Sequence, residues 1–97
     1  MTYYTRQQVL ELLDLDEGLL VALEREEIVE GDAPSSAGGE FSERMLERAR
    51  VAANLVRELD VNLPGAAIIV RMREEMAELR HRVTEVLAEL ERRGGRG

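Results

Sequence analysis

The last third of the chain repeats apolar residues at alternating spacings of three and four. These are the a and d positions of a coiled-coil heptad, and they predict one long helix over about residues 64–92. A single helix cannot bury such a stripe by itself, so either a second copy of the chain or the preceding helix must cover it. Because the stripe is longer than the small domain beside it, we predict a homodimer. The predicted interface residues are Ile69, Met72, Met76, Leu79, Val83, Val86 and Leu90.

The first 42 residues predict two short helices joined by a tight turn, which is a helix-turn-helix unit. Thr5 and Gln8 have the spacing of a capping box and start a first helix that ends near residue 13 or 14. Asp16 is the expected N-cap of a second helix over residues 17–27. Glu17 lies in its first turn, where a negative charge is favourable.

A loop is expected over residues 31–40, because this segment is small, polar and rich in glycine. It lies between Ile28-Val29 and Phe41. These apolar residues can pair as two very short strands, which would make the loop a wing. The Gly38-Gly39 pair indicates a turn and no phosphate-binding loop.

Two further helices complete the pattern. Ser42 is the expected N-cap of a third helix that runs to about Leu59, and Asn62 caps the long last helix, with Pro64 in its first turn. The apolar side of the third helix comprises Met45, Leu46, Ala49, Ala52, Ala53, Val56 and Leu59. The predicted fold is therefore mainly α. It has a winged helix-turn-helix over residues 1–42, a helical region with a coiled-coil dimerisation helix over 43–92, and a frayed tail over 93–97.

The acidic residues are concentrated in the helix-turn-helix half. Residues 1–42 hold ten acidic residues and two arginines, whereas the remaining residues hold ten acids and eleven arginines. A protein that binds duplex DNA needs several basic side chains against the phosphates, and an acidic surface repels them. The charge argues against direct DNA binding and favours a basic protein partner. The alternative is that these acidic residues form an ordinary solvated surface with no partner.

The sequence contains few side chains that could serve in catalysis or bind a metal ion. The chain has no cysteine and one histidine, His81, which falls at an outward heptad position and is expected to be a solvated surface residue. No nucleophile–base set is visible, so we predict no enzyme, no cofactor and no metal. No apolar run is long enough for a membrane span and no signal peptide opens the chain. We therefore expect a cytoplasmic protein.

The order of these elements resembles the MerR-like helix-turn-helix superfamily. Within it the chain is similar to the CbpM-type chaperone modulators, and the likeness covers about residues 3–90. Residues 57–69, which read RELDVNLPGAAII, carry the resemblance best. The family has a similar Pro-Gly or Ala-Gly helix start, followed by an aliphatic run and a short coiled-coil helix.

The resemblance implies a function. CbpM-type proteins bind the J-domain of a DnaJ-like co-chaperone, such as CbpA, and restrain its action on DnaK. A J-domain engages DnaK through a basic helix, so an inhibitor needs an acidic surface. The candidate partner-binding residues lie on and beside the second helix: Asp16, Glu17, Val21, Glu24, Arg25, Glu26, Glu27 and Glu30.

Two other functions stay open. A heat-shock repressor of the HspR type has a similar Val-Asn-Leu-x-Gly junction, here Val61 to Gly65, and would bind DNA as a dimer. Such repressors have a basic recognition helix and wing, and this chain lacks both. A dimeric scaffold that assembles DnaK with its co-chaperone, rather than inhibiting it, is the third alternative.

Overall fold

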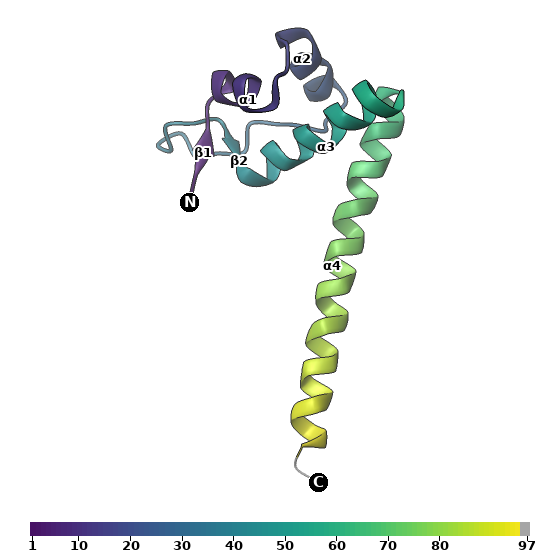
Figure 1. Cartoon of the computed structure of the whole chain (residues 1–97). Helices are drawn as coiled ribbons and strands as arrows, with labels where there is room; N and C mark the ends of the chain where they lie inside the picture. Colours follow the sequence, from purple (N-terminus) through teal and green to yellow (C-terminus); the bar gives the residue numbers. More distant parts are fainter. Residues whose placement is uncertain (96–97) are drawn as a thin grey trace.

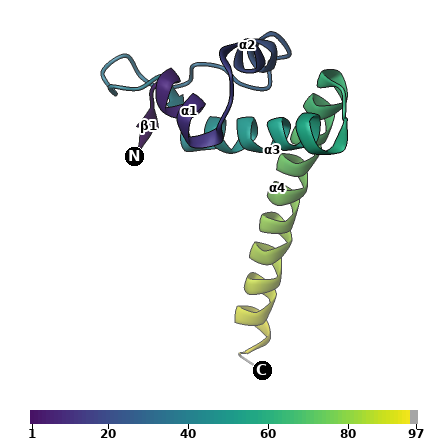
Figure 2. The same ribbon diagram turned by 45° about the horizontal axis from the view of Figure 1, so that its top comes forward.

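The protein is an L-shaped molecule made of a small head and one long helix (Figure 1, Figure 2). The computed structural model describes residues 1–95. Its elements, in chain order, are β1 (Tyr3–Tyr4), α1 (Arg6–Leu13), α2 (Glu17–Arg25), β2 (Phe41–Ser42), α3 (Glu43–Leu59) and α4 (Leu63–Gly94). We call residues 3–59, from β1 to the end of α3, the head. The prediction of a mainly helical fold with a long last helix is confirmed.

Every predicted helix start is confirmed by its cap. Thr5 and Gln8 form the capping box: the Thr5 Oγ1 accepts from the Gln8 backbone N–H at 3.1 Å, and the Gln8 Oε1 accepts from the Thr5 N–H at 2.8 Å. Asp16, Ser42 and Asn62 each accept a backbone N–H three residues further on, at 2.7, 3.3 and 2.7 Å. These bonds satisfy N–H groups that have no partner within the helix, so the sequence fixes where each helix begins.

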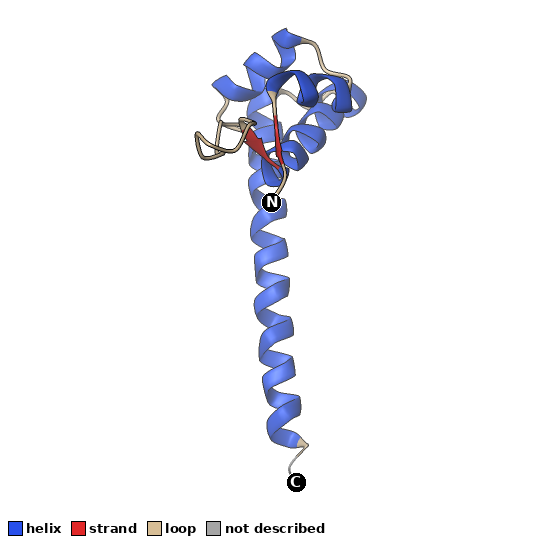
Figure 3. Cartoon of the chain, turned by 90° about the vertical axis from the view of Figure 1, so that its left-hand side faces the viewer, coloured by secondary structure: helices blue, strands red, loops and turns tan. Residues whose placement is uncertain are grey.

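The predicted strand pairing was wrong. β2 pairs antiparallel with β1, so that Tyr3 lies opposite Ser42 and Tyr4 opposite Phe41 (Figure 3). Ile28 and Val29 form no strand, because both of their backbone N–H groups bond to the carbonyl of Leu23 and close the end of α2. Their side chains are buried in the core. The loop over residues 31–40 therefore connects α2 to β2, and no strand precedes the loop.

Gly39 is required where this loop crosses β1. A Cβ atom at this position would lie 2.8 Å from both the Tyr3 carbonyl carbon and the Tyr4 nitrogen. The next residue, Glu40, donates its N–H to the Tyr4 carbonyl at 2.8 Å. Gly38 supplies the turn itself, with φ of +74°. The Gly-Gly pair thus serves both a turn and a close backbone approach.

The core of the head is aliphatic, with one aromatic ring at its centre. Its largest fully buried side chains are Phe41, Leu20, Leu23, Ile28, Met45, Val9 and Val29. α1 and α2 pack chiefly on α3, and Arg57 on α3 donates to the carbonyls of Leu13 and Asp14 at the end of α1, at 3.3 and 2.7 Å. Leu59 was expected on the apolar side of α3, but 68% of its surface is exposed. The chain turns at Asp60, directly after it, and most of the Leu59 side chain is left in solvent.

α3 and α4 meet through small side chains. Ala52 and Ala53 on α3 and Ala66 and Ala67 on α4 are all buried, and Val70 is the last buried residue of α4. Arg44 and Arg48 of α3 both lie within ion-pair distance of Glu74, at 3.1 and 3.8 Å, where α4 leaves the head. Beyond this point α4 projects away from the head as a free rod (Figure 1).

The apolar stripe of α4 is exposed along almost its whole length. Ile69 is half-buried beside α3, whereas Met72, Met76, Leu79, Val83, Val86 and Leu90 are each at least 50% exposed. The alternative that α3 covers the stripe therefore does not describe this chain. The expected fraying from residue 93 is also corrected: α4 continues through Arg93 and Gly94, and residues 96–97 lie outside the described part of the chain. No helix within residues 1–95 is long and apolar enough to cross a membrane.

Candidate partner-binding surface

The predicted partner-binding residues lie on the outer side of α2 and just after it. Leu20 and Leu23 turn the inner side of α2 into the core and leave the acidic positions outward. At the start of the helix, Asp16 is occupied as the N-cap. Val21 is half-buried and Arg25 is exposed. The helix thus presents carboxylates to solvent with little apolar surface between them.

Two of the candidate glutamates are already paired with Arg6, at the first position of α1. The Arg6 Nε donates to the Glu17 Oε1 at 2.6 Å, and its Nη2 donates to the Glu24 Oε1 at 2.6 Å. The bond to Glu24 contributes most to raising the pKa of the Arg6 guanidinium, with Glu17 adding to it. We call this group of three residues the Arg6 clamp. It ties α1 to α2 and engages two of the six candidate carboxylates, whose negative charge the single guanidinium offsets by one unit.

The contact of Arg6 with α2 was not predicted from the sequence. Arg6 and Glu17 are eleven positions apart and lie on different helices. Glu17 and Glu24, however, are seven positions apart and so share one face of α2. Two glutamates at this spacing, in an acidic segment that holds only two arginines, are the signal that could have found the clamp.

The remaining carboxylates gather where α2 ends. Glu26, Glu27 and Glu30 have no ion-pair partner within the described residues 1–95. Glu27 and Glu30 are exposed, and Glu26 is half-buried. We call these three residues the free carboxylates. They are the part of the predicted surface that is available to attract a basic partner.

Glu27 has an unfavourable backbone conformation for its residue type. Its φ is +59°, in the left-handed region, and it follows the C-cap Glu26. The Glu27 N–H bonds to the Glu24 carbonyl at 3.0 Å and the Ile28 N–H to the Leu23 carbonyl at 3.0 Å. This is the Schellman arrangement, in which glycine is the usual residue at the position of Glu27. A carboxylate here also lies at the negative end of the helix dipole.

We expect Glu27→Gly to stabilise the protein by roughly 1 kcal/mol. Glycine adopts the left-handed conformation without strain, and loss of the Glu27 carboxylate removes an unfavourable interaction with the helix dipole. For a chain of this size that is a rise in Tm of about 4–8 °C. Thermal unfolding followed by circular dichroism measures it. Glu26→Gly is the matched control, because it removes the same charge at a φ of −83°. Equal melting temperatures for the two variants would contradict the argument.

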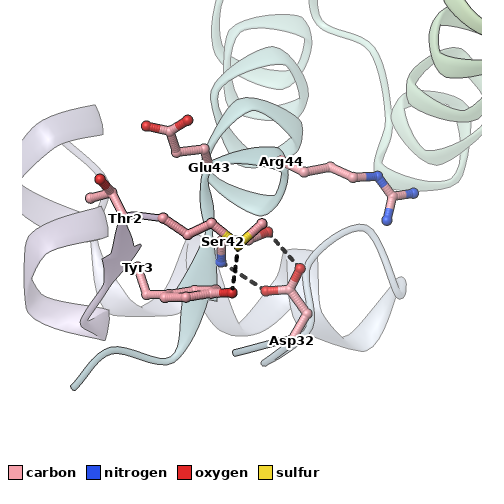
Figure 4. Close-up of a pocket in the computed structure, with 7 residues that line it drawn as sticks. Thr2, Tyr3, Asp32, Ser42, Glu43 and Arg44 are labelled. Atoms are coloured by element: carbon pink, nitrogen blue, oxygen red, sulfur yellow. Dashed lines mark hydrogen bonds between the residues drawn. The ribbon is translucent and has the colours of Figure 1, made fainter. Parts of the chain in front are cut away.

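A pocket of about 400 Å³ beside β1 and the start of α3 is not part of this surface (Figure 4). Asp32 reaches back from the loop and accepts from the Ser42 backbone N–H at 2.8 Å and from its hydroxyl at 2.5 Å. Arg44 points away from that carboxylate and donates two bonds of 3.1 Å to Glu74, which raises the pKa of Arg44. The charged groups of the pocket thus serve to hold the loop and α4 to α3.

Two further titratable side chains each contact one glutamate. The His81 Nε2 lies 2.8 Å from the Glu85 Oε1, one turn further along α4, and both side chains are exposed. Tyr4 donates its hydroxyl to Glu43 at 3.4 Å; desolvation raises the pKa of this phenol, and the Glu43 carboxylate raises it further. Over residues 1–95, no three His, Asp or Glu side chains are grouped so as to hold a metal ion.

Comparison with known proteins gives a family and a set of distant relatives. A family model described as MerR HTH family regulatory protein matches residues 4–88. The chaperone modulatory proteins CbpM of Coxiella burnetii strain Dugway 5J108-111 and strain RSA 331 / Henzerling II are each 26% identical to the chain over 65 residues. That alignment covers 67% of this chain, and the chain spans 61% of the length of these relatives. No solved structure gives a significant match.

These matches bear on two of the expectations from the sequence. The resemblance to CbpM-type proteins within a MerR-like superfamily is confirmed. Neither the family description nor the name of the relatives is that of an enzyme. The family match extends from Tyr4 at the sheet to Ala88 near the end of α4, so it includes the helix-turn-helix, α3 and most of the rod. The chain belongs to the MerR HTH family of regulatory proteins.

Proposed function

We propose that this protein is a cytoplasmic chaperone modulator that binds the J-domain of a DnaJ/CbpA-like co-chaperone and restrains its action on DnaK. The observation that carries the proposal is the similarity to chaperone modulatory proteins over 65 residues. The charge distribution supports it independently, because the acids concentrate on the head and a J-domain presents a basic helix. The helix-turn-helix of residues 1–42 is the proposed binding unit, and the region from α3 to α4 is the proposed dimerisation unit.

The free carboxylates are the proposed charged contacts, and the Arg6 clamp is the proposed support that holds α2 in place. Exposed ion pairs contribute only about 0.2–1 kcal/mol each, so three carboxylates alone give modest affinity. Val21, half-buried on the outer side of α2, is the proposed apolar contact, and Asp16 and Arg25 border the same surface. Attraction between exposed charges is screened by salt, so binding should weaken as the ionic strength rises.

Titration calorimetry with J-domains from the same genome tests the proposal. We expect binding at micromolar concentrations or tighter, and a Kd about 2- to 30-fold higher for Glu27→Gln/Glu30→Gln, which removes two exposed charge contacts. Glu58→Gln/Glu91→Gln is the matched control, since both residues are exposed and far along the chain from α2. If no J-domain gives heat, or if the two double variants bind equally, the proposed surface is wrong.

The ATP hydrolysis rate of DnaK tests whether the protein inhibits or promotes the action of the co-chaperone. When the protein is added to DnaK and its co-chaperone, we expect the co-chaperone-stimulated ATP hydrolysis of DnaK to fall, because the basic helix of the J-domain is covered. A rise in hydrolysis would instead identify the protein as a scaffold that assembles the two chaperones.

A DNA-binding regulator is the second candidate, and the family match over residues 4–88 favours it. Against it, Arg25 is the only basic residue of α2, and the loop over residues 31–40 carries no basic residue. Phosphate contacts from Lys or Arg supply most of the affinity of a DNA reader. Sequence-dependent retention of promoter DNA by this protein alone in a low-salt gel shift would favour this candidate over the first.

We also propose that the protein forms a homodimer through the stripe of α4. Single apolar residues on a surface are ordinary, but a contiguous apolar stripe marks an interface. A heptad pattern of a and d residues is, in addition, a surface that packs well against another helix with the same pattern.

A further inference from the structure

A small cleft lies between α3 and α4, where the rod leaves the head (Figure 1). Its volume is about 180 Å³, which is below the usual size of a pocket for a drug-sized ligand, so it has room only for a small molecule. We call this space the elbow cleft. Its lining combines an apolar wall with four charged side chains: Val51, Val70 and Ala77, and Glu47, Arg48, Arg73 and Glu74.

The elbow cleft lies on the side of α4 that faces away from the heptad stripe. Val70, Glu74 and Ala77 follow one another at about one turn of the helix, and all three line the cleft. Leu79 of the stripe is nine residues from Val70, which is about two and a half turns and therefore the opposite side of α4. Pairing of two copies through the stripe would thus leave the elbow cleft open to solvent.

Arg48 brings a buried charge to the elbow cleft, and its Nε has no hydrogen-bond partner within the described residues 1–95. Only 11% of the Arg48 side chain is exposed. Its ion-pair partner, the Oε2 of Glu74, lies 3.8 Å from the Nε, which is too long for a hydrogen bond. Native proteins nearly always supply a partner to a buried donor, because one left without an acceptor is unfavourable. An acceptor that enters the elbow cleft would meet this need.

The two carboxylates of the lining are already bonded to arginines outside the cleft. Glu74 accepts two bonds of 3.1 Å from Arg44. Glu47 accepts from the Nε of Arg50 at 2.6 Å. The two arginines of the lining therefore form a positive site that these carboxylates do not fully neutralise. Such a site favours a negatively charged ligand.

We propose that the elbow cleft binds a small aliphatic monocarboxylate, whose carboxylate group is held by Arg48 and Arg73. Guanidinium groups match the geometry of carboxylates and bind them through paired N–H donors. Arg73 is exposed and has no ion-pair partner over residues 1–95. The aliphatic part of the ligand would pack on Val51 and Val70. This proposal depends neither on J-domain binding nor on the homodimer.

The charge of the ligand follows from the carboxylates that remain at the edge of the cleft. Glu74 lies 3.8 Å from the Arg48 Nε and would repel an anion with two negative charges more strongly than an anion with one. The apolar wall, in turn, favours a ligand with an aliphatic part over a bare inorganic anion. A monocarboxylate with a short branched chain satisfies both conditions.

Two-dimensional NMR of the arginine Nε–H groups tests the site by titration of the full chain. The probe is isobutyrate, with isobutyramide as its uncharged counterpart and inorganic phosphate as a more highly charged anion. We expect isobutyrate to move the Arg48 Nε–H signal downfield, with a Kd on the order of 1 mM, because so small a ligand makes few contacts. Isobutyramide and phosphate should bind about tenfold more weakly or worse.

The other outcomes of this titration contradict the proposal in different ways. If phosphate binds as tightly as isobutyrate, the cleft takes any small anion and the carboxylate class is wrong. If isobutyramide binds equally well, the two arginines do not select for charge. If none of the three probes moves the Arg48 signal, the elbow cleft holds only water and the site itself is wrong.

Variants of the two arginines give a second test. Arg73→Gln should raise the Kd of isobutyrate about tenfold or more, because a charge-assisted hydrogen bond is lost. Arg71→Gln is the matched control, since Arg71 is exposed on the same helix and does not line the cleft. Equal Kd values for these two variants would overturn the proposed site. Arg48→Gln should abolish binding, and if this buried substitution prevents folding, the comparison of Arg73→Gln with Arg71→Gln still decides.

Discussion

Replacing Phe41 by alanine is expected to cost about 3–5 kcal/mol of folding free energy, the largest effect of any single substitution in the head. Phe41 is the largest fully buried side chain, and its backbone also pairs with Tyr4 in the sheet. A domain of this size has about 5–15 kcal/mol of stability in total. The variant should therefore lose a large share of the free energy of unfolding. Urea denaturation followed by circular dichroism measures the loss.

Leu12→Ala is the matched control for Phe41. It removes a large apolar side chain from the same head, but 61% of Leu12 is exposed, so little buried surface is lost. We expect its free energy of unfolding to stay within about 0.5 kcal/mol of that of the parent protein. A Phe41→Ala protein that unfolds at the same urea concentration as Leu12→Ala would show that the ring does not organise the core.

The double substitution Met76→Glu/Val83→Glu is expected to convert the proposed homodimer into a monomer, with a dissociation constant raised by a factor of about 1,000 or more. Each copy would bury two carboxylates without partners, at a cost of several kcal/mol. The head should stay folded, because neither residue contacts it; both are about half exposed on the rod. Sedimentation equilibrium should report half the parent mass.

The control for this variant adds the same charges on the outer side of the rod, as His81→Glu/Ala88→Glu. These positions face away from the stripe, and the control should keep the parent mass. A parent mass retained by Met76→Glu/Val83→Glu would mean that the stripe is not the interface. Because the rod is exposed in the single chain, the association would then have to use another surface.

The helices of this protein could be predicted closely, because their ends are decided by local chemistry. Thr5, Asp16, Ser42 and Asn62 bond to N–H groups three residues away, and such bonds are readable from spacing alone. The heptad stripe was equally readable, since its period is a property of one helix. That the stripe continues past the head was correctly anticipated for the same reason.

The strand pairing and the Arg6 clamp could not be read from the sequence in this way. Tyr4 and Phe41 are distant in the chain, and two-residue strands leave almost no periodic signal. Ile28 and Val29 look like a strand because they are β-branched, but the Schellman turn at Glu27 uses their N–H groups. The clamp depends on how α1 crosses α2, and the sequence does not encode that angle locally. Two of the predicted partner-binding residues, Glu17 and Glu24, are consequently paired with Arg6 and are not free charges.

The pairing of β1 with β2 also governs when the head can form during synthesis. The third and fourth residues of the chain need residues 41–42 as partners, and α1 and α2 pack chiefly on α3. A nascent chain that ends before α3 therefore has no cover for Val9, Leu20 and Leu23, although the sequence of its two helices is complete. The acidic surface should take shape on the ribosome only after residue 59 has left the exit tunnel, in one late and cooperative step.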